Sequence, residues 1–299
     1  MQPSRATACT LVAALGPIAA LAPACNSILG NDSAEVVPVD ASTSLDAGTP
    51  DSPVVSDAPD ASDAAMVWDA SACPSGKGPV MVNVANLFCI DSTEVTIAQY
   101  SQFLTAGKTP GSLGEPMPAC AFNKSYTPNG QGYDPGLPIT YPVTYVDWCD
   151  AFAFCAWSGK RLCGAVGGTA DGGATTPAAF ATLQNEHYYA CSAGGTRMYP
   201  YGDTYSATAC NGIMPMKVGV AVPAGILATC EGGFTGLFDM VGNVEEWQNG
   251  CAASGGPTDM CLHGTGSFDY GTPACGYVDQ DERNFQHGDV GIRCCASLP

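Results

Sequence analysis

Cysteine is the residue type in this sequence with the greatest capacity for chemistry, because sixteen cysteines occur among 299 residues. Thiolates bind soft metals, act as nucleophiles or join as disulfides. Zinc ribbons and iron–sulfur sites use pairs of cysteines two residues apart, and that spacing is missing here. The cysteines are instead spread through sequence rich in glycine and proline, which is typical of the disulfides of an exported protein.

The serine and histidine residues show weaker signs of a chemical function than the cysteines do. Ser267 lies near His263, but the glycine that must follow the serine in a nucleophile elbow is absent, so we expect a turn residue. His187, His263 and His287 lack the spacing of metal ligands. We therefore expect all three histidines to have packing or surface roles.

The chain is strongly acidic, with a net charge of −18 when the histidines are neutral. A phosphate backbone attracts basic residues, so the charge excludes nucleic acid as a partner. Electrostatic docking on an anionic membrane surface is excluded for the same reason. Much of the acidity lies between Arg5 and Lys77, where no basic residue occurs. A second acidic run, Asp279, Asp281 and Glu282, is expected in a solvated loop.

Residues 1–24 have the pattern of a signal peptide, because the apolar stretch at residues 11–21 is too short to span a bilayer. Cleavage after residues 22–24, Ala-Pro-Ala, fits a secreted protein. Cleavage before Cys25 fits a bacterial lipoprotein whose thiol carries the lipid. Losing Cys9 with the leader and using Cys25 as the anchor leaves an even number of cysteines, which favours the lipoprotein. We expect an exported protein, anchored at the cell envelope or secreted.

Residues 25–72 are rich in Asp, Ala, Ser and Pro and nearly lack aromatic side chains. Their charge has one sign, and no core can offset the entropy of ordering them. We therefore expect an acidic, disordered tether that holds a domain away from a surface. From Cys73 onward the composition becomes globular, so residues 73–299 are expected to form the domain.

The expected elements of the domain are short. Residues 80–82 and 87–90 are typical of strands. Thr96 and Asp147 are expected to cap helices whose apolar residues recur at helical spacing, and a shorter helix is expected around residues 186–191. Beyond these elements we expect mainly irregular segments. Few elements and many cysteines predict an irregular α+β domain stapled by disulfides.

Five separated blocks of the domain, spanning about residues 80–296, carry a family pattern. They contain Phe88-Cys89-Ile90-Asp91-Ser92-Thr93-Glu94-Val95-Thr96, Pro142-Val143-Thr144-Tyr145-Val146-Asp147-Trp148, Tyr189-Ala190-Cys191-Ser192-Ala193-Gly194-Gly195, Gly236-Leu237-Phe238-Asp239-Met240-Val241-Gly242-Asn243-Val244-Glu245-Glu246-Trp247, and Gly266-Ser267-Phe268 with Gly291-Ile292-Arg293-Cys294. In this order the blocks resemble the formylglycine-generating enzyme (sulfatase-modifying factor) family. The resemblance implies an irregular α+β fold, related to C-type lectins, with low secondary-structure content.

The resemblance implies a specific activity, the oxygen-dependent oxidation of a sulfatase cysteine to formylglycine. The family holds monovalent copper between two thiolates, and soft sulfur ligands suit that ion. The positions that match the two copper ligands are Tyr270 and Cys275. Cys275 also matches a structural cysteine that lies nineteen residues before Cys294, and that alignment deletes the segment with both ligands. At most one ligand remains, so we expect Cys275 in a disulfide rather than as a catalytic thiol.

The resemblance assigns two bridges, Cys155–Cys294 and Cys191–Cys275. Three further pairs are expected from proximity in the sequence alone: Cys73–Cys89, Cys210–Cys230 and Cys251–Cys261. Four cysteines of the domain have no assigned partner: Cys120, Cys149, Cys163 and Cys295.

A calcium site is also implied by the resemblance, at the positions Asp239, Gly242, Val244 and Glu246. Two carboxylates and two backbone carbonyls are hard oxygen ligands, and glycine permits the tight turn. Alternatively, Asp239 only caps a turn and Glu246 faces solvent. The family's other calcium site matches only at Asn211 and is not expected.

Three functions agree with these features. The first is a non-catalytic binding or scaffold module for a protein or glycan ligand on the cell envelope, with membrane contact only through a lipid anchor. The second is an active formylglycine-generating oxidase that uses copper and Cys275. The third, an iron-dependent sulfoxide synthase, requires a histidine-rich partner domain for which the tether leaves no room. The missing copper ligand favours the first, with calcium as a structural ion.

Overall fold

The structure, a computed structural model, describes residues 73–129, 139–168, 176–212, 220–252, 255–268 and 274–298. All of them belong to one compact unit, Asp63–Pro299. The expected signal peptide, the tether with Cys25, and Tyr270 lie outside the described residues.

The first sheet joins segments that are far apart in the sequence. Its strand order is β1-β2-β8-β3, with β1 at Met81–Val84, β2 at Phe88–Asp91, β8 at Cys294–Ala296 and β3 at Arg161–Leu162. β1 and β2 pair as the antiparallel hairpin that the sequence predicts. Ala85 and Asn86 make its turn with φ angles of 53° and 57°, the left-handed pair that suits the twist of a hairpin.

Two helices begin at the caps predicted from the sequence. α1 (Ile97–Thr105) follows Thr96, whose side chain and that of Gln99 form a reciprocal capping box. α2 (Trp148–Trp157) follows Asp147, which forms the same arrangement with Asp150. The remaining helices are short: α3 (Pro177–Phe180), α4 (Glu186–Cys191) and the 3₁₀ turn η2 (Ala228–Cys230). In the described segments no helix has the length and apolar character to cross a membrane.

A second sheet occupies the region where the sequence predicted mainly irregular segments. Its strand order is β6-β5-β4-β7, with β4 at Glu245–Cys251, β5 at Met260–Gly264, β6 at Asp279–Glu282 and β7 at Val290–Gly291. β7 pairs with β4 in parallel, and the other pairs are antiparallel. The acidic run expected in a loop is therefore strand β6, because its backbone pairs with β5 from Met260 to His263.

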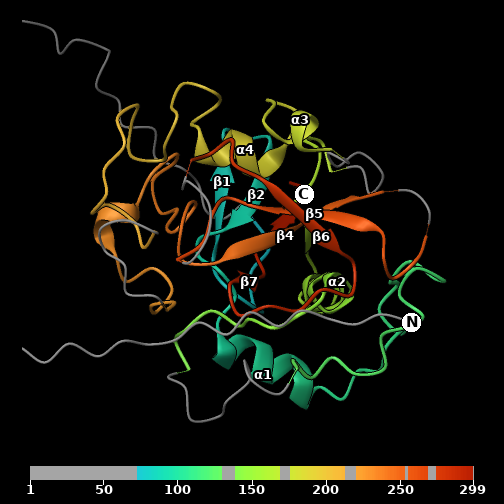
Figure 1. The fold of residues 1–299 in the computed structure, drawn as a ribbon. Helices are drawn as coiled ribbons and strands as arrows, with labels where there is room; N and C mark the ends of the chain where they lie inside the picture. Colours follow the sequence, from blue (N-terminus) through green and yellow to red (C-terminus); the bar gives the residue numbers. More distant parts are fainter. Residues whose placement is uncertain are drawn as a thin grey trace, which may run out of the picture. The chain divides into compact units, whose positions relative to one another are not determined.

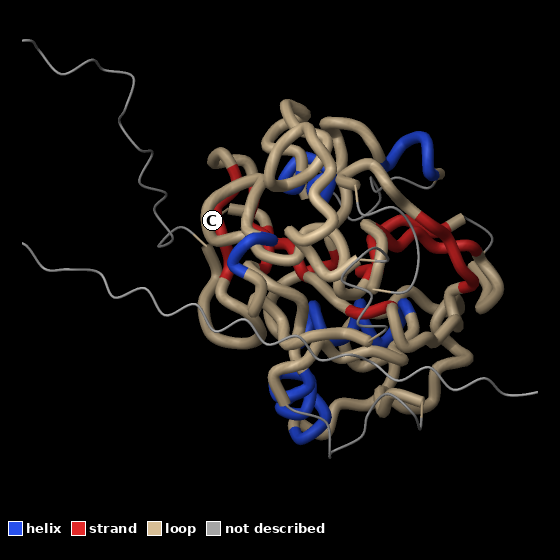
Figure 2. The backbone as a smooth tube through the Cα atoms, turned by 60° about the vertical axis from the view of Figure 1, so that its left-hand side comes forward, coloured by secondary structure: helices blue, strands red, loops and turns tan. Residues whose placement is uncertain are grey.

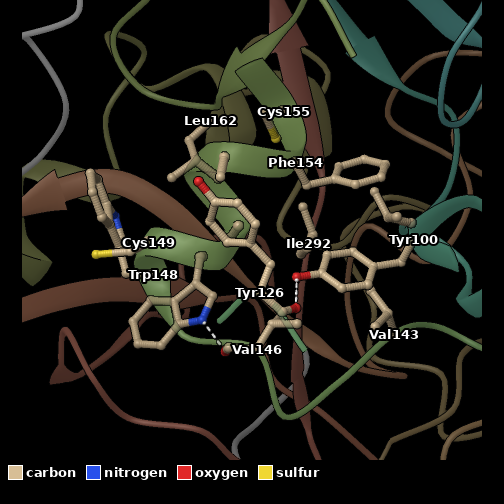
Figure 3. Packing of buried hydrophobic residues seen from close by; sticks show 14 of the residues in the cluster. Tyr100, Tyr126, Val143, Val146, Trp148, Cys149, Phe154, Cys155, Leu162 and Ile292 are labelled. Carbon is tan, nitrogen blue, oxygen red and sulfur yellow. Dashed lines mark hydrogen bonds between the residues drawn. The ribbon is translucent and has the colours of Figure 1, made fainter. Parts of the chain in front are cut away.

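The largest core cluster lies around α1 and α2, as Figure 3 shows. Tyr100 stacks on Phe154 with ring centroids 5.6 Å apart, and its hydroxyl donates a 2.7 Å hydrogen bond to the Tyr126 carbonyl. The short helices lie around the two sheets (Figure 1), and loops form most of the chain path (Figure 2). The predicted class, an irregular, disulfide-stapled α+β fold with little secondary structure, is confirmed.

Candidate functional site

Cys275, the weak candidate for a catalytic thiol, is a structural cysteine. Its sulfur is bonded to that of Cys191, at the end of α4, and neither residue is exposed to solvent. The second bridge implied by the resemblance, Cys155–Cys294, is also present and joins α2 to β8. The position that could have supplied one copper ligand therefore carries no thiol.

The other described cysteines are paired as well. The three pairs expected from proximity are present: Cys73–Cys89, Cys210–Cys230 and Cys251–Cys261. The cysteines left unassigned form Cys120–Cys149 and Cys163–Cys295. Across the residues that the structure describes, every cysteine is thus in a disulfide, and no pair of thiolates exists there for Cu(I).

Ser267 lies beside the carboxylate of Asp289. Its hydroxyl donates a 3.2 Å hydrogen bond to Asp289 Oδ2, and the other Asp289 oxygen contacts His287 Nδ1. The carboxylate thus separates serine from imidazole, whereas a nucleophilic triad needs the imidazole in the middle. The sequence-based expectation that Ser267 is not an elbow nucleophile agrees with this order.

His263 is the most strongly perturbed histidine, and the sequence alone did not single it out for this role. It lies on β5 with 3% of its surface exposed, and its ring contacts Glu245 Oε2 of β4 and Asp281 Oδ2 of β6, the latter at 3.1 Å. Burial opposes the charged ring, but the hydrogen bonds to Asp281 and Glu245 outweigh it and raise the pKa of His263 to about 9. The imidazolium is therefore a fixed positive charge at neutral pH.

A cavity of about 230 Å³ opens beside this histidine. Its charged and imidazole lining comprises Glu245, His263, Asp279, Asp281, His287 and Asp289. The sequence signal that could have found it is the alternation of acids in Asp279-Gln280-Asp281, since residues two apart in a strand share a face.

Three of the predicted calcium positions, Asp239, Gly242 and Val244, lie on the loop that leads into β4, and Glu246 lies in β4 itself. Asp239, Gly242 and Asn243 have φ angles of 54°, 76° and 58°, so the loop coils through three left-handed residues. At Gly242 a side chain is also excluded by space, because a Cβ would lie 2.6 Å from the Asn211 carbonyl oxygen. Val244 and Glu246 are buried, and the alternative that Glu246 faces solvent is wrong.

A buried guanidinium, that of Arg293, lies against this loop. Its Nε donates a 3.0 Å hydrogen bond to Glu246 Oε1, and its Nη2 donates to the carbonyls of Phe238 and Asp239, both at 3.0 Å. Its Nη1 donates to the Asp91 carbonyl at 2.9 Å. Arg293 thus ties this loop to strands β2 and β4.

Negative charge around Arg293 exceeds what one guanidinium can balance. Glu94, Asp239 and Glu246 are all buried there. Burial, followed by the charge of Asp239, raises the pKa of Glu94 well above its ordinary value, although Arg293 opposes this. Burial likewise raises the pKa of Asp239 to about 6. A cation added at this place would relieve both carboxyls.

The donor atoms present fit calcium. Asp239 Oδ1 and Glu246 Oε2 are buried and have no hydrogen-bond partner, although His187 Nε2 lies 3.3 Å from the Glu246 oxygen without hydrogen-bond geometry. Within the described segments no three acidic, imidazole or thiol side chains form a metal-binding group, so an ion here must also use backbone carbonyls. Two carboxylates with the Gly242 and Val244 carbonyls are such a set.

Comparison with known proteins gives a family model and several relatives. The model of the sulfatase-modifying factor enzyme 1-like domain matches residues 62–298. An inactive C-alpha-formylglycine-generating enzyme 2 from Bos taurus is 30% identical over 129 residues, covering 40% of this chain and 36% of the relative. A formylglycine-generating enzyme from Mus musculus is 30% identical over 119 residues, covering 36% of this chain and 26% of the relative. Each match thus spans well under half of the relative's length.

Solved structures are similar at a lower level. CarF is 24% identical with a TM-score of 0.47, covering 71% of this chain and 87% of CarF. PvdO from Pseudomonas aeruginosa is 21% identical with a TM-score of 0.45, covering 71% of this chain and 80% of PvdO.

Proposed function

The chain belongs to the sulfatase-modifying factor enzyme 1-like domain family, and we propose that it acts in this family as a non-catalytic binding or scaffold module. The observation that carries the proposal is the Cys191–Cys275 disulfide, which removes the thiol at the one position that could match a copper ligand. A family member named as inactive is among the relatives, which supports a role without the oxidation. The alternative is an active formylglycine-generating oxidase that converts a sulfatase cysteine to formylglycine.

A sulfatase-motif peptide separates these two functions. Incubated with the purified chain, Cu(I) and dioxygen, its cysteine is expected to stay unchanged, because the described residues supply no pair of thiolates. Mass spectrometry and a hydrazide probe for aldehydes measure the outcome, with an active formylglycine-generating enzyme as the positive control. Aldehyde formation above the level without protein would overturn the proposal.

We place the module outside the reducing cytosol. Its support is the leader pattern of residues 1–24 together with seven disulfides in the described residues. In this proposal a lipid on Cys25 anchors the chain to the cell envelope, and residues 25–72 act as the spacer. The partner is a protein or glycan ligand at that surface, and the relation to C-type lectins stays a prediction.

Calcium is proposed as a structural ion of the module. The Asp239 and Glu246 side chains, with the carbonyls of Gly242 and Val244, would hold it, and the ion would supply the positive charge that the buried carboxyls lack. Added Ca²⁺ is expected to raise the melting temperature of the chelator-treated protein. At a hundredfold excess over the dissociation constant the gain is about 2.7 kcal/mol.

The matched variants for this test are Asp239→Asn and Glu246→Gln, which keep the side-chain shapes and remove the charges. Both are expected to lose the calcium response, whereas Glu282→Gln, on the exposed face of β6, is expected to keep it. Calorimetric scans with and without chelator measure the shifts. A wild-type melting temperature that chelator leaves unchanged would exclude the calcium site.

A further inference from the structure

The acidic cavity beside His263 is formed by the second sheet and by the segment between β6 and β7. Glu245 reaches it from β4, Asp279 and Asp281 from β6, and Asp289 from the residue before β7. Among the described residues that line the cavity there is no lysine or arginine. With two imidazoles against four carboxylates, the lining keeps a negative charge even if both rings are protonated.

One lining oxygen has no donor. Glu245 is 2% exposed, and its Oε1 is buried without a hydrogen-bond partner, while its Oε2 contacts His263. A buried carboxylate oxygen left unpaired is unfavourable, so proteins normally supply a donor for it. A ligand that brings an N–H group into the cavity would satisfy this atom.

The wall of the cavity is aromatic. Phe285 lies between two imidazoles, nearly parallel to both: its centroid is 6.4 Å from that of His263 at 11° and 5.7 Å from that of His287 at 19°. Such a wall packs against methylene groups, while the carboxylates of the lining attract the positive charge. The ligand that fits therefore combines positive charge with an apolar stem.

The kind of cationic group that fits follows from the carboxylates that line the cavity. Each of these carboxylates already has at least one oxygen in contact with another group of the protein. Glu245 and Asp281 each contact His263, Asp279 Oδ1 accepts from the Gln280 N–H, and both Asp289 oxygens are engaged. A guanidinium binds best when one carboxylate offers both oxygens side by side. An ammonium is a compact point charge with three donors, and it can contact single oxygens of several carboxylates.

The geometry points to a binding site for a primary ammonium group on a methylene chain, with Glu245 Oε1 as its buried acceptor and Phe285 as the wall for the stem. The inference rests on the proposed binding function and names the ligand chemistry of that module. A larger hollow of about 600 Å³ shares Asp281 and Phe285 with the cavity, so a lysine side chain of an extended partner segment can supply the group as well as a free diamine.

The direct probe is cadaverine, a five-carbon diamine, titrated calorimetrically into the full chain at low ionic strength. Cadaverine is expected to bind, 1,5-pentanediol to give no heat, and 1,5-diguanidinopentane, in which both ammonium groups are replaced by guanidinium groups, to bind about fivefold more weakly. The diol lacks the charge that the carboxylates attract, and a guanidinium binds best to a single carboxylate that offers both oxygens.

Glu245→Gln is expected to weaken cadaverine binding about tenfold, and Asp279→Asn, at the cavity mouth, about threefold. Asp203→Asn is the matched control, since Asp203 is exposed and lines neither the cavity nor the adjoining larger hollow, and it is expected to change the affinity less than about twofold. Circular dichroism checks that each variant folds. If Glu245→Gln does not fold, the result for Asp279→Asn tests the inference. No cadaverine binding at millimolar concentration, equal binding of the diol, or full affinity in both cavity variants would overturn the inference.

An acetylated pentapeptide with one central lysine separates the two sources of the ammonium group. Tighter binding of this peptide than of cadaverine identifies a protein segment, and weaker binding identifies a free amine; both support the ammonium site. The test also separates this inference from the proposed function. If no amine binds and no aldehyde forms, the ammonium site is wrong but the non-catalytic function stands. If aldehyde forms, the proposal of a non-catalytic module is wrong.

Discussion

Replacing Arg293 with methionine is expected to lower the free energy of unfolding by about 3–5 kcal/mol, because removing one partner of a buried ion pair leaves charge uncompensated. Arg293 has no exposed surface and donates to Glu246 and to the carbonyls of Asp91, Phe238 and Asp239. Arg293→Lys is expected to lose less, since an ammonium keeps the charge but cannot reach all four acceptors. Urea unfolding of both variants measures the difference.

Arg197→Met is the control, because Arg197 is exposed and its guanidinium donates a single hydrogen bond, to the Pro200 carbonyl. A surface substitution of this kind is expected to change stability by less than about 0.5 kcal/mol. If Arg293→Met is as mild as the control, the carboxyls buried around Arg293 need no counter-charge in the native state. That outcome would contradict the role assigned to Arg293.

Removing the Cys155–Cys294 bridge with paired alanines is expected to destabilise the domain by about 5 kcal/mol in the chain-entropy account. The bridge joins residues 139 apart, so the reduced chain regains the freedom of a very long loop. The Cys251–Cys261 bridge spans only 10 residues, and its removal is expected to lower stability by about 3 kcal/mol. The two double variants are compared by urea unfolding.

The comparison tests the loop-length dependence directly, because each variant replaces two cysteines by two alanines. A larger slope of free energy against urea is also expected in the Cys155/Cys294 variant, whose unfolded chain exposes more surface. Equal losses in the two variants would show that local packing of the sulfurs, rather than the closed loop, determines the stabilisation.

Local signals in the sequence predict the helices well. Thr96 and Asp147 are caps whose partners, Gln99 and Asp150, stand three residues further on, so each helix start is encoded within one turn. The β1–β2 hairpin is similarly local, with its turn at residues 85–86. These elements need no distant contact to be recognised.

The second sheet is difficult to predict from the sequence because its strands break the usual polar–apolar alternation. β4 begins with Glu245 and Glu246, both buried, and Gln248 is buried further along the strand. Charged residues at buried positions suggest a loop unless their partners are known, and those partners come from other segments, His263 for Glu245 and Arg293 for Glu246. The pattern is intelligible only after the strands pair.

The candidate sites likewise include one that the sequence predicts and one that depends on contacts between distant segments. The disulfide bonding of Cys275 is predictable because cysteine positions can be compared directly with a family pattern. Its partner Cys191 follows from the same comparison. The ammonium cavity is not predictable in this manner, because His263, Asp281 and Phe285 meet through strand pairing and ring stacking. The alternation of Asp279 and Asp281 is a local signal, but it does not identify the residues of other segments that complete the cavity.

The position of β8 has a consequence for biosynthesis. β8 lies between β2 and β3 in the first sheet, and its two cysteines are bonded to Cys155 and Cys163. The ribosome must therefore synthesise more than 200 residues after β2, up to Arg293, before it reaches the strand that pairs with both β2 and β3. Until then β2 has an open edge, so the nascent chain cannot complete its first sheet.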